Sequence, residues 1–278
     1  MSTISASEVN KLRQMTGAGM MDCKKALAET NGDLEAAIDF LRTKGQKISL
    51  NRNDRTVKEG AVIALTSADK KTGVIVELNC ETDFVAKNED YVKLVHEIAK
   101  IALDNKIENV DALKAAQIGN VTIEQRLLDE MGKTGEKMEI SKCILVTGEN
   151  VVSYIHAGNK MGVLVELNNA SSDANTAAGK DVAMQIAAMN PIAVDDKGVD
   201  KETVEREIQV GKEQAIAEGK PAEMAEKIAQ GRLNKFFKEY TLLNQEFVKD
   251  SSKTIAKMLN DTEAGLTVKS FKRAALGA

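Results

Sequence analysis

Gly73-Val74-Ile75-Val76-Glu77-Leu78-Asn79 decides the fold of this 278-residue chain, because it returns in nearly the same form as Gly162-Val163-Leu164-Val165-Glu166-Leu167-Asn168. Each stretch is short, apolar and rich in β-branched residues, which is typical of a buried strand. A second apolar run precedes each stretch, at 61–65 and 151–155, and an apolar helical pattern follows each. Chance similarity between two strands would not preserve this order and spacing. The repeat therefore predicts a duplicated α+β core built from two hairpin-plus-helix units.

Three short helical patterns precede the core, within residues 5–45. Ser5 and Glu8 form a capping-box pattern at the first, and we expect Asp22 and Asp33 to cap the second and the third. Isolated helices of about ten residues are marginal in water, so these three must pack together. We predict a three-helix bundle over residues 1–45, with its last helix ending near Gly45, and a linker over residues 46–58.

The core is expected to contain one insertion. We assign residues 59–147 to its first half, and residues 148–199 and 249–278 to its second half. Residues 200–248 show long helical periodicity broken at Gly219-Lys220-Pro221, where glycine ends one helix and proline begins the next. This pattern predicts an antiparallel helical hairpin of coiled-coil type. Its apolar stripe is either satisfied between its own two helices or used in a homodimer, and the sequence leaves both possibilities open.

The composition is that of an ordinary folded protein, and it argues against several classes of function. The chain has 43% hydrophobic and 29% charged residues, and its formal net charge is −4. An acidic chain lacks the basic footprint of nucleic-acid binders, so we expect no direct nucleic-acid partner. The N-terminus shows no export signal, and no apolar run is long enough for a membrane span. We therefore expect a cytoplasmic protein without a membrane partner.

Three cysteines (Cys23, Cys80 and Cys143) and two histidines (His96 and His156) lie far apart along the chain. They do not have the spacing of a metal site, so we expect neither a metal nor another cofactor. Reduced structural thiols agree with a cytosolic location. A cysteine hydrolase built on Cys80 is the enzymatic alternative. Against it, Cys80 continues the alternation of a strand, and neither histidine has the sequence context of a general base.

Asn79-Cys80-Glu81-Thr82-Asp83-Phe84-Val85-Ala86 places an aromatic ring beside a carboxylate just after the first buried strand. The chain has only 3% aromatic residues, so a phenylalanine in a polar segment stands out. A helical pattern follows from about Glu89, which predicts an exposed strand-to-helix loop. The matching segment of the second half, Ala170-Ser171-Ser172-Asp173, has no aromatic residue. The simplest active role for Phe84 is a wedge that enters a partner; the alternative is a ring buried in the chain's own core.

A resemblance to a known family rests on two motifs. The first is Leu12-Arg13 together with Thr16-Gly17-Ala18-Gly19-Met20-Met21-Asp22-Cys23-Lys24-Lys25-Ala26-Leu27, and the second is the segment 79–86. They resemble, in this order, the two signatures of the bacterial elongation factor Ts family. The similarity extends over nearly the whole chain, including the duplicated core and the helical hairpin. It implies a ubiquitin-associated-like N-terminal bundle. It also implies a guanine-nucleotide exchange factor for elongation factor Tu, with no covalent chemistry of its own.

The resemblance also implies roles for particular residues. Thr82-Asp83-Phe84-Val85 would enter beside the partner's magnesium site and promote GDP release during translation elongation. Arg13, Met20 and Met21 would contact the partner's nucleotide-binding domain from another side, and His156 would face a further partner domain. Adjacent methionines at a helix start suit such a recognition surface, although one of them could instead be buried. A passive binding module, whose bundle only recruits a partner, is the remaining alternative.

Overall fold

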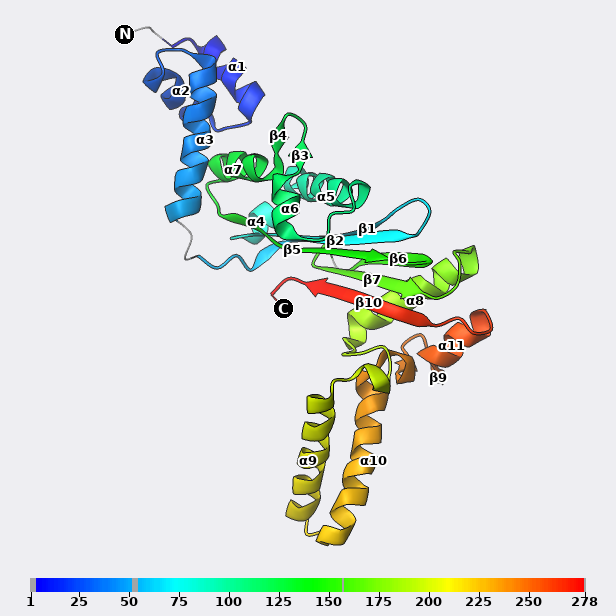
Figure 1. The fold of residues 1–278 in the computed structure, drawn as a ribbon. Coiled ribbons are helices and arrows are strands. Elements are labelled where there is room, and N and C mark those ends of the chain that lie inside the picture. The colour runs from blue at the N-terminus through cyan, green and yellow to red at the C-terminus, as the bar shows by residue number, and fades with distance from the viewer. Residues whose placement is uncertain (1–3, 52–54, 157, 278) are drawn as a thin grey trace.

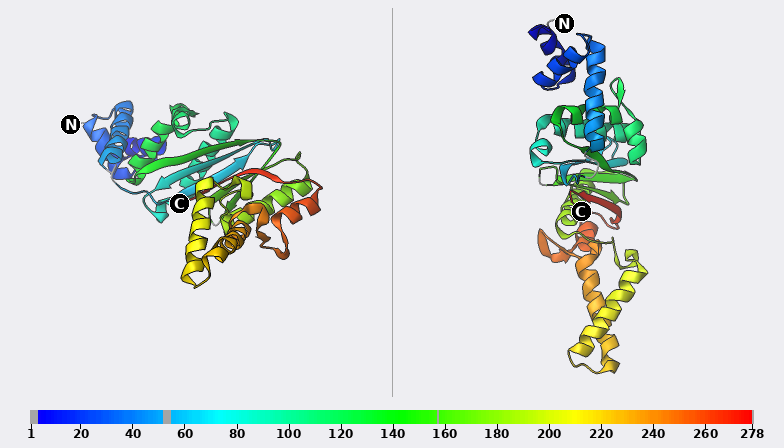
Figure 2. Two further views of the ribbon diagram at one scale, coloured as in Figure 1. Left: turned by 60° about the horizontal axis from the view of Figure 1, so that its bottom comes forward. Right: turned by 90° about the vertical axis from the view of Figure 1, so that its left-hand side faces the viewer.

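The computed structural model describes residues 4–51, 55–156 and 158–277. Residues 52–54 of the predicted linker and Ala157 lie outside these ranges. The N-terminal helices lie at one end of the molecule, two stacked sheets with their helices form the middle, and a two-helix hairpin projects at the opposite end (Figures 1 and 2). This mixture of helices and small antiparallel sheets confirms the α+β class.

Two three-stranded antiparallel sheets form the core. The first has the order β1-β2-β5 and the second has the order β6-β7-β10. The strands are β1 (Glu59–Thr66), β2 (Thr72–Cys80), β5 (Met138–Thr147), β6 (Asn150–His156), β7 (Met161–Leu167) and β10 (Val268–Ala275). In both sheets the second strand of the hairpin is central, and the strand that follows the helices pairs with it. The equal strand order agrees with the predicted duplication.

Alternation along the two central strands explains why the repeated stretch is apolar at nearly every position. One set of side chains packs against the helices of its own half: Val74, Val76 and Leu78 on β2, and Val163, Val165 and Leu167 on β7. The intervening Ile75 and Leu164 belong instead to a cluster between the two sheets. Because side chains alternate along a strand, both faces of each central strand are covered.

Gly73 and Gly162, which hold equivalent positions in the repeat, allow the two sheets to approach closely. A Cβ atom on Gly73 would lie 2.7 Å from Cγ1 of Val151 and 2.8 Å from Cδ2 of Leu164. A Cβ atom on Gly162 would lie 3.0 Å from Cγ1 of Val62. Each glycine thus faces the sheet of the other half, and glycine is a packing requirement at both positions.

Helices cover the outer face of each sheet. On the first sheet lie α5 (Glu89–Asp104) and α7 (Ile123–Thr134), which are connected by α6 (Val110–Ala115) and by the short strands β3 (Gln117–Ile118) and β4 (Val121–Thr122). On the second sheet lie α8 (Asp173–Met189) and α11 (Ile255–Thr262). The start of α5 at Glu89 agrees with the sequence prediction, whereas β5 and the β3–β4 pair were not predicted.

The N-terminal bundle consists of α1 (Ala6–Thr16), α2 (Met20–Glu29) and α3 (Leu34–Asn51), packed around a small core of their own. The predicted capping box of Ser5 and Glu8 is confirmed, as is the Asp33 cap, whose carboxylate accepts from Ala36 N–H at 3.0 Å. The predicted Asp22 cap is wrong. Gly19 precedes α2 without a side-chain cap, and Asp22 lies in the first turn, paired with Lys44 at 2.7 Å.

The prediction that the third helix ends near Gly45 is also wrong, because α3 continues to Asn51. Gly45 is buried where α3 crosses α7. A Cβ atom on Gly45 would lie 2.1 Å from the carbonyl oxygen of Leu128 in α7. This glycine therefore serves close helix packing rather than helix termination.

The hairpin consists of α9 (Lys201–Ala217) and α10 (Ala222–Tyr240), which pack together through small residues such as Gly211 and Ala229. Its second helix ends earlier than residue 248. The following η2 (Leu242–Asn244), β8 (Glu246–Phe247) and β9 (Asp250–Thr254) return to the second half, where Leu242 and Phe247 are buried. The chain's own helices thus cover one apolar stripe; a homodimer through the hairpin stays a prediction.

Candidate functional site

The segment 82–86 forms a one-turn helix, α4 (Asp83–Ala86), instead of the predicted loop. Thr82 caps this helix: its Oγ1 accepts from Val85 N–H at 3.4 Å. Val85 and Ala86 are half-buried and pack against the core of the first half. The ring of Phe84 points the other way and is 84% exposed. The structure therefore contradicts the alternative that Phe84 is buried in its own core.

Two hydrogen-bonded carboxylates fix the start of α4 to the loop between α7 and β5. Glu136 accepts from Thr82 N–H at 3.1 Å and from the Thr82 hydroxyl at 2.7 Å. Glu81 accepts in return from Lys137 N–H at 2.8 Å, and it also pairs with Arg55 at 2.8 Å. The base of the exposed ring is thus held from two sides, so Phe84 is presented on a rigid support.

Asp83 is engaged within its own helix. Its carboxylate accepts from Lys87 Nζ at 2.6 Å. This hydrogen bond holds the pKa of the Asp83 carboxyl below its usual value, and the positive charge of Lys160 contributes to the same shift. Lys160 belongs to the turn between β6 and β7, so the second half of the core contributes charge beside α4. Asp83 is ionised at neutral pH and already has a partner.

His156 is the last residue of β6, directly before the β6–β7 turn, and it is exposed. Its Nδ1 lies 2.8 Å from the Tyr154 hydroxyl, and the two rings are 5.8 Å apart. The same turn is bound to the first sheet, because Asn159 C=O accepts from Val62 N–H at 2.7 Å. The structure thus joins the turn that follows His156 to the half that carries Phe84.

The residues predicted on the bundle are exposed, and they lie on helices other than the one that carries Phe84. Met20 and Met21 begin α2 and are 54% and 75% exposed, so the alternative that one of them is buried is wrong. Arg13 is exposed on α1, and Met15 adds a third exposed methionine at 58%. We call Arg13, Met15, Met20 and Met21 the bundle surface.

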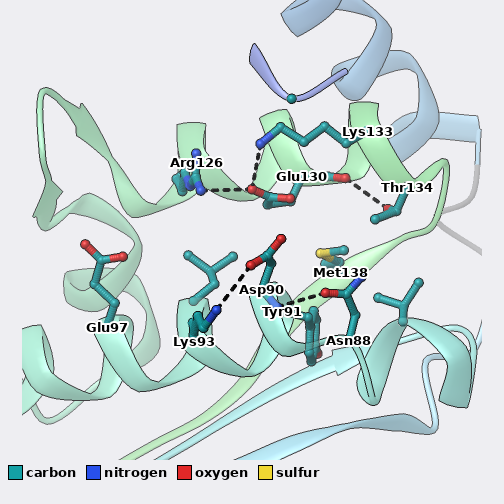
Figure 3. Close-up of a pocket in the computed structure, with 13 residues that line it drawn as sticks. Asn88, Asp90, Tyr91, Lys93, Glu97, Arg126, Glu130, Lys133, Thr134 and Met138 are labelled. Carbon is teal, nitrogen blue, oxygen red and sulfur yellow. Dashed lines mark hydrogen bonds and ion pairs between the residues drawn. The ribbon is translucent and has the colours of Figure 1, made fainter. Parts of the chain in front are cut away.

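A polar cavity of about 420 Å³ lies between the bundle and α4. Figure 3 shows that α5 and α7 form its facing walls; α7 contributes Glu130, which pairs with both Arg126 and Lys133 at 3.0 Å. Gly17 of the bundle and Val85 of α4 also line it. The α7 wall carries two cations and one carboxylate, and the α5 wall carries one cation and two carboxylates, so the charges of the two walls together compensate one another. This arrangement separates the bundle surface from Phe84 without presenting an excess charge of its own.

The cysteines do not form a reactive site. Cys80 and Cys143 are buried, and their thiols donate to the carbonyls of Thr82 and Ile107 at 3.2 and 3.4 Å. Burial raises the pKa of both thiols to about 11, so neither is a thiolate at neutral pH. These properties contradict the hydrolase alternative.

The part of the chain that the structure describes contains no cluster of three or more acidic, histidine or cysteine side chains placed to hold a metal. Among the same residues, none of the helices combines the length and the hydrophobicity that crossing a bilayer demands.

Sequence reasoning missed three residues of the site, and they differ in how they could have been found. Lys87 is four residues after Asp83, a spacing at which opposite charges meet on a helix, so recognising α4 would have identified it. Arg55 and Glu136 reach the segment from 26 and 54 residues away. No local pattern indicates contacts at such separations.

Comparison with known proteins agrees with this architecture. The family model described as Elongation factor TS matches residues 81–278, from the base of α4 onward. The chain is 53% identical to Elongation factor Ts of Cytophaga hutchinsonii over 277 residues, which cover 99% of this chain and 100% of the relative. It is 49% identical to Elongation factor Ts of Flavobacterium psychrophilum, with both chains covered in full. Elongation factor Ts of Porphyromonas gingivalis is 44% identical, with 99% of each chain covered.

Fold, site and similarity together define a translation elongation factor of protein biosynthesis. The chain belongs to the elongation factor Ts family.

Proposed function

We propose that this protein is a guanine-nucleotide exchange factor for elongation factor Tu, and that it promotes GDP release by disturbing the magnesium and phosphate site. The single observation that carries the proposal is the exposed ring of Phe84 on a helix whose base is fixed by Glu136 and Glu81. Exposure of a large aromatic ring to water is unfavourable, so a partner that covers the ring of Phe84 gains binding free energy. Because α4 is rigidly supported, binding of the partner costs little conformational entropy.

The proposed mechanism acts on the metal rather than on a bond. Mg²⁺ requires near-octahedral oxygen geometry, so a small displacement of its ligands removes much of its binding free energy. Phe84 enters an apolar slot and shifts the elements that carry these ligands. Asp83 gives up its hydrogen bond to Lys87 and either accepts from donors of the partner or repels the phosphate charge of the nucleotide. Thr82 and Val85 complete the contact with the partner. No covalent step by this chain is involved.

Burial of Phe84 does not suffice alone. Covering one phenylalanine contributes roughly 1.5–3 kcal/mol, which corresponds to about a 10- to 150-fold change in an equilibrium constant. The remaining free energy comes from the bundle surface, with Arg13, Met20 and Met21 on the nucleotide-binding domain, and from His156 on a further domain. The ubiquitin-associated-like bundle supplies affinity for the partner, and α4 disturbs the partner's magnesium and phosphate site.

Two further features follow from this proposal. Binding free energies are reciprocal, so a factor that weakens nucleotide binding is itself released by nucleotide. The factor therefore binds both nucleotide-free and GDP-loaded elongation factor Tu. It acts where translation takes place, in the cytoplasm, and it needs no direct contact with nucleic acid or membrane.

The test is stopped-flow release of fluorescent GDP from elongation factor Tu at increasing concentrations of this protein. We expect Phe84→Ala to lower the maximal stimulated rate by at least about tenfold, the low end of the burial term. The melting temperature should change little, because the ring has few contacts to lose. Phe84→Leu should recover part of the rate. Val248→Ala, which shortens another exposed apolar side chain (51%), is the matched control.

An unchanged maximal rate in Phe84→Ala would refute the wedge while leaving a binding role open. Absence of any stimulation by the wild-type protein would refute the exchange function itself.

A further inference from the structure

We infer that Gly45 is a positioning residue, whose contact with α7 fixes the distance between the bundle surface and Phe84. This inference rests on the proposed exchange function and adds a residue to it. Gly45 touches neither surface. It lies at the crossing of α3 and α7, where the bundle meets the core.

The crossing is a contact between two backbones. A Cβ atom on Gly45 would lie 2.1 Å from the carbonyl oxygen and 2.9 Å from the carbonyl carbon of Leu128. Real side chains do not approach a backbone so closely, so the helices must separate if Gly45 gains a side chain. Gly132 lies on the opposite helix, where a Cβ atom would be 3.4 Å from Leu41 C=O. Glycine thus occurs on both sides of the crossing, but Gly45 is the tighter position.

Contacts beside the crossing are looser. A cavity of about 170 Å³ lies between the bundle and α7, lined on the bundle side by residues that include Met15, Ala18 and Leu41. The larger cavity of Figure 3 lies between the bundle and α4, and among its lining residues Gly17 is the one that belongs to the bundle. An ion pair of Arg42 and Asp129 at 3.6 Å spans the same boundary. The Arg42 and Asp129 side chains are 36% and 25% exposed, and their atoms are too far apart for a hydrogen bond. The glycine crossing, by contrast, leaves no room for even one added carbon atom.

A fixed distance matters because both surfaces act on one partner molecule. When two binding elements are joined rigidly at the correct separation, the second contact forms at a high effective concentration. A mobile joint lowers that concentration without altering either surface. Loosening the crossing should therefore weaken binding of elongation factor Tu, but it should leave the disturbance caused by bound Phe84 unchanged.

Gly45→Ala tests this in the full-length chain. Gly231→Ala is the matched control, because Gly231 also lies inside a helix, α10, and a Cβ atom there meets nothing within 4 Å. Stopped-flow release gives the half-saturating concentration of the factor and the maximal rate separately. For Gly45→Ala we expect the half-saturating concentration to rise about tenfold or more, with the maximal rate within twofold of wild type. Gly132→Ala should give a smaller change in the same direction.

A second measurement omits the partner. Spin labels on Lys25→Cys in α2 and Lys180→Cys in α8, both exposed positions, report the bundle-to-core distance by pulsed electron resonance. The native cysteines are buried and should not be labelled. We expect Gly45→Ala to broaden the distance distribution and Gly231→Ala to leave it unchanged, while circular dichroism shows full helicity in both.

The inference is supported only when the distances broaden and the half-saturating concentration rises. It is overturned by a distribution as narrow as that of wild type, since the glycine would then not hold the bundle. It is equally overturned by broadened distances with unchanged half-saturation, or by a loss confined to the maximal rate. Failure of the exchange function itself would appear in the wild-type release curve and would not affect the distance measurement.

Discussion

Glu136 accepts from both hydrogen-bond donors of Thr82, the backbone N–H at 3.1 Å and the hydroxyl at 2.7 Å, although the two residues are 54 positions apart. Thr82 caps the helix that carries Phe84, so this carboxylate controls the orientation of a ring that it does not touch. Positioning of the exposed ring therefore depends on the loop between α7 and β5 as much as on the segment 82–86 itself.

Removal of this brace should slow exchange without weakening the fold of the core. For Glu136→Ala we expect the maximal rate of stimulated GDP release to fall about tenfold, or about 1.4 kcal/mol, near the low end for one hydrogen bond to a charged group. Stopped-flow measurement provides the rate. Glu149→Ala, which shortens an exposed glutamate in the β5–β6 turn, should leave it unchanged. A normal rate in Glu136→Ala would show that Glu81 and the apolar contacts hold α4 without Glu136.

The two glycines between the sheets should differ in their tolerance of a side chain. Gly73→Ala places Cβ within 2.8 Å of two side chains of the opposite sheet, and overpacking of this kind costs about 1–3 kcal/mol of unfolding free energy. Gly162→Ala meets its nearest atom at 3.0 Å and should cost less. Urea unfolding of both variants measures the difference. Equal losses would mean that the sheets relax apart to the same extent at both ends.

The ion pair of Asp83 and Lys87 should slow stimulated GDP release slightly, because this pair must break before Asp83 can contact the partner. Exposed ion pairs contribute about 0.2–1 kcal/mol, so Lys87→Met should raise the stimulated release rate by no more than about fivefold. The increase should disappear near 1 M salt, where the Debye length is about 3 Å. Lys93→Met removes another exposed lysine from its ion pairs and serves as the control. Slower release in Lys87→Met would indicate instead that Lys87 itself contacts the partner.

The buried thiols should make stability depend on alkaline pH. The pKa of Cys80 and Cys143 is raised to about 11 in the folded protein, above the usual value of about 8.5. The folded state keeps these protons while the unfolded chain loses them, so the stabilisation is complete below pH 8.5 and declines as the pH rises toward 11. Unfolding midpoints in urea between pH 8 and 11 should fall less steeply in the Cys80→Ser, Cys143→Ser double variant. Equal slopes would contradict the raised pKa values.

The repeat of the central strand predicted two related hairpins, because each copy is covered on both faces and is therefore apolar at nearly every position. It did not predict β5, the third strand of the first sheet. The start of α5 and the Ser5–Glu8 cap were also predicted, because the first depends on a strong periodicity and the second on neighbours within one turn. The predictions that Gly45 ends a helix and that Asp22 caps one were wrong, because neither role depends on sequence neighbours. Their roles are set by α7 and by Lys44, which lie elsewhere in the sequence, and local patterns contain no information on such contacts.

The site was predicted in part. An aromatic residue in a polar segment pointed to Phe84, and the structure places its ring in solvent. The short helix that carries it was missed, because a single turn stabilised by its cap and by Val85 packing has no periodicity to detect. Glu136 and Arg55 were missed because they approach from distant parts of the chain.

The cluster between the two sheets has a consequence for how such a core can arise. Val62 and Ile75 of the first half are buried only because Val151 and Leu164 of the second half cover them, and the reverse is equally true. A gene that encoded only one hairpin-plus-helix unit would yield a protein with an exposed apolar sheet face. Two copies of that protein would associate through this face as a symmetric dimer. Fusion of tandem copies makes that association independent of concentration, and the segments that follow the two central strands are then free to differ, as they do at Phe84.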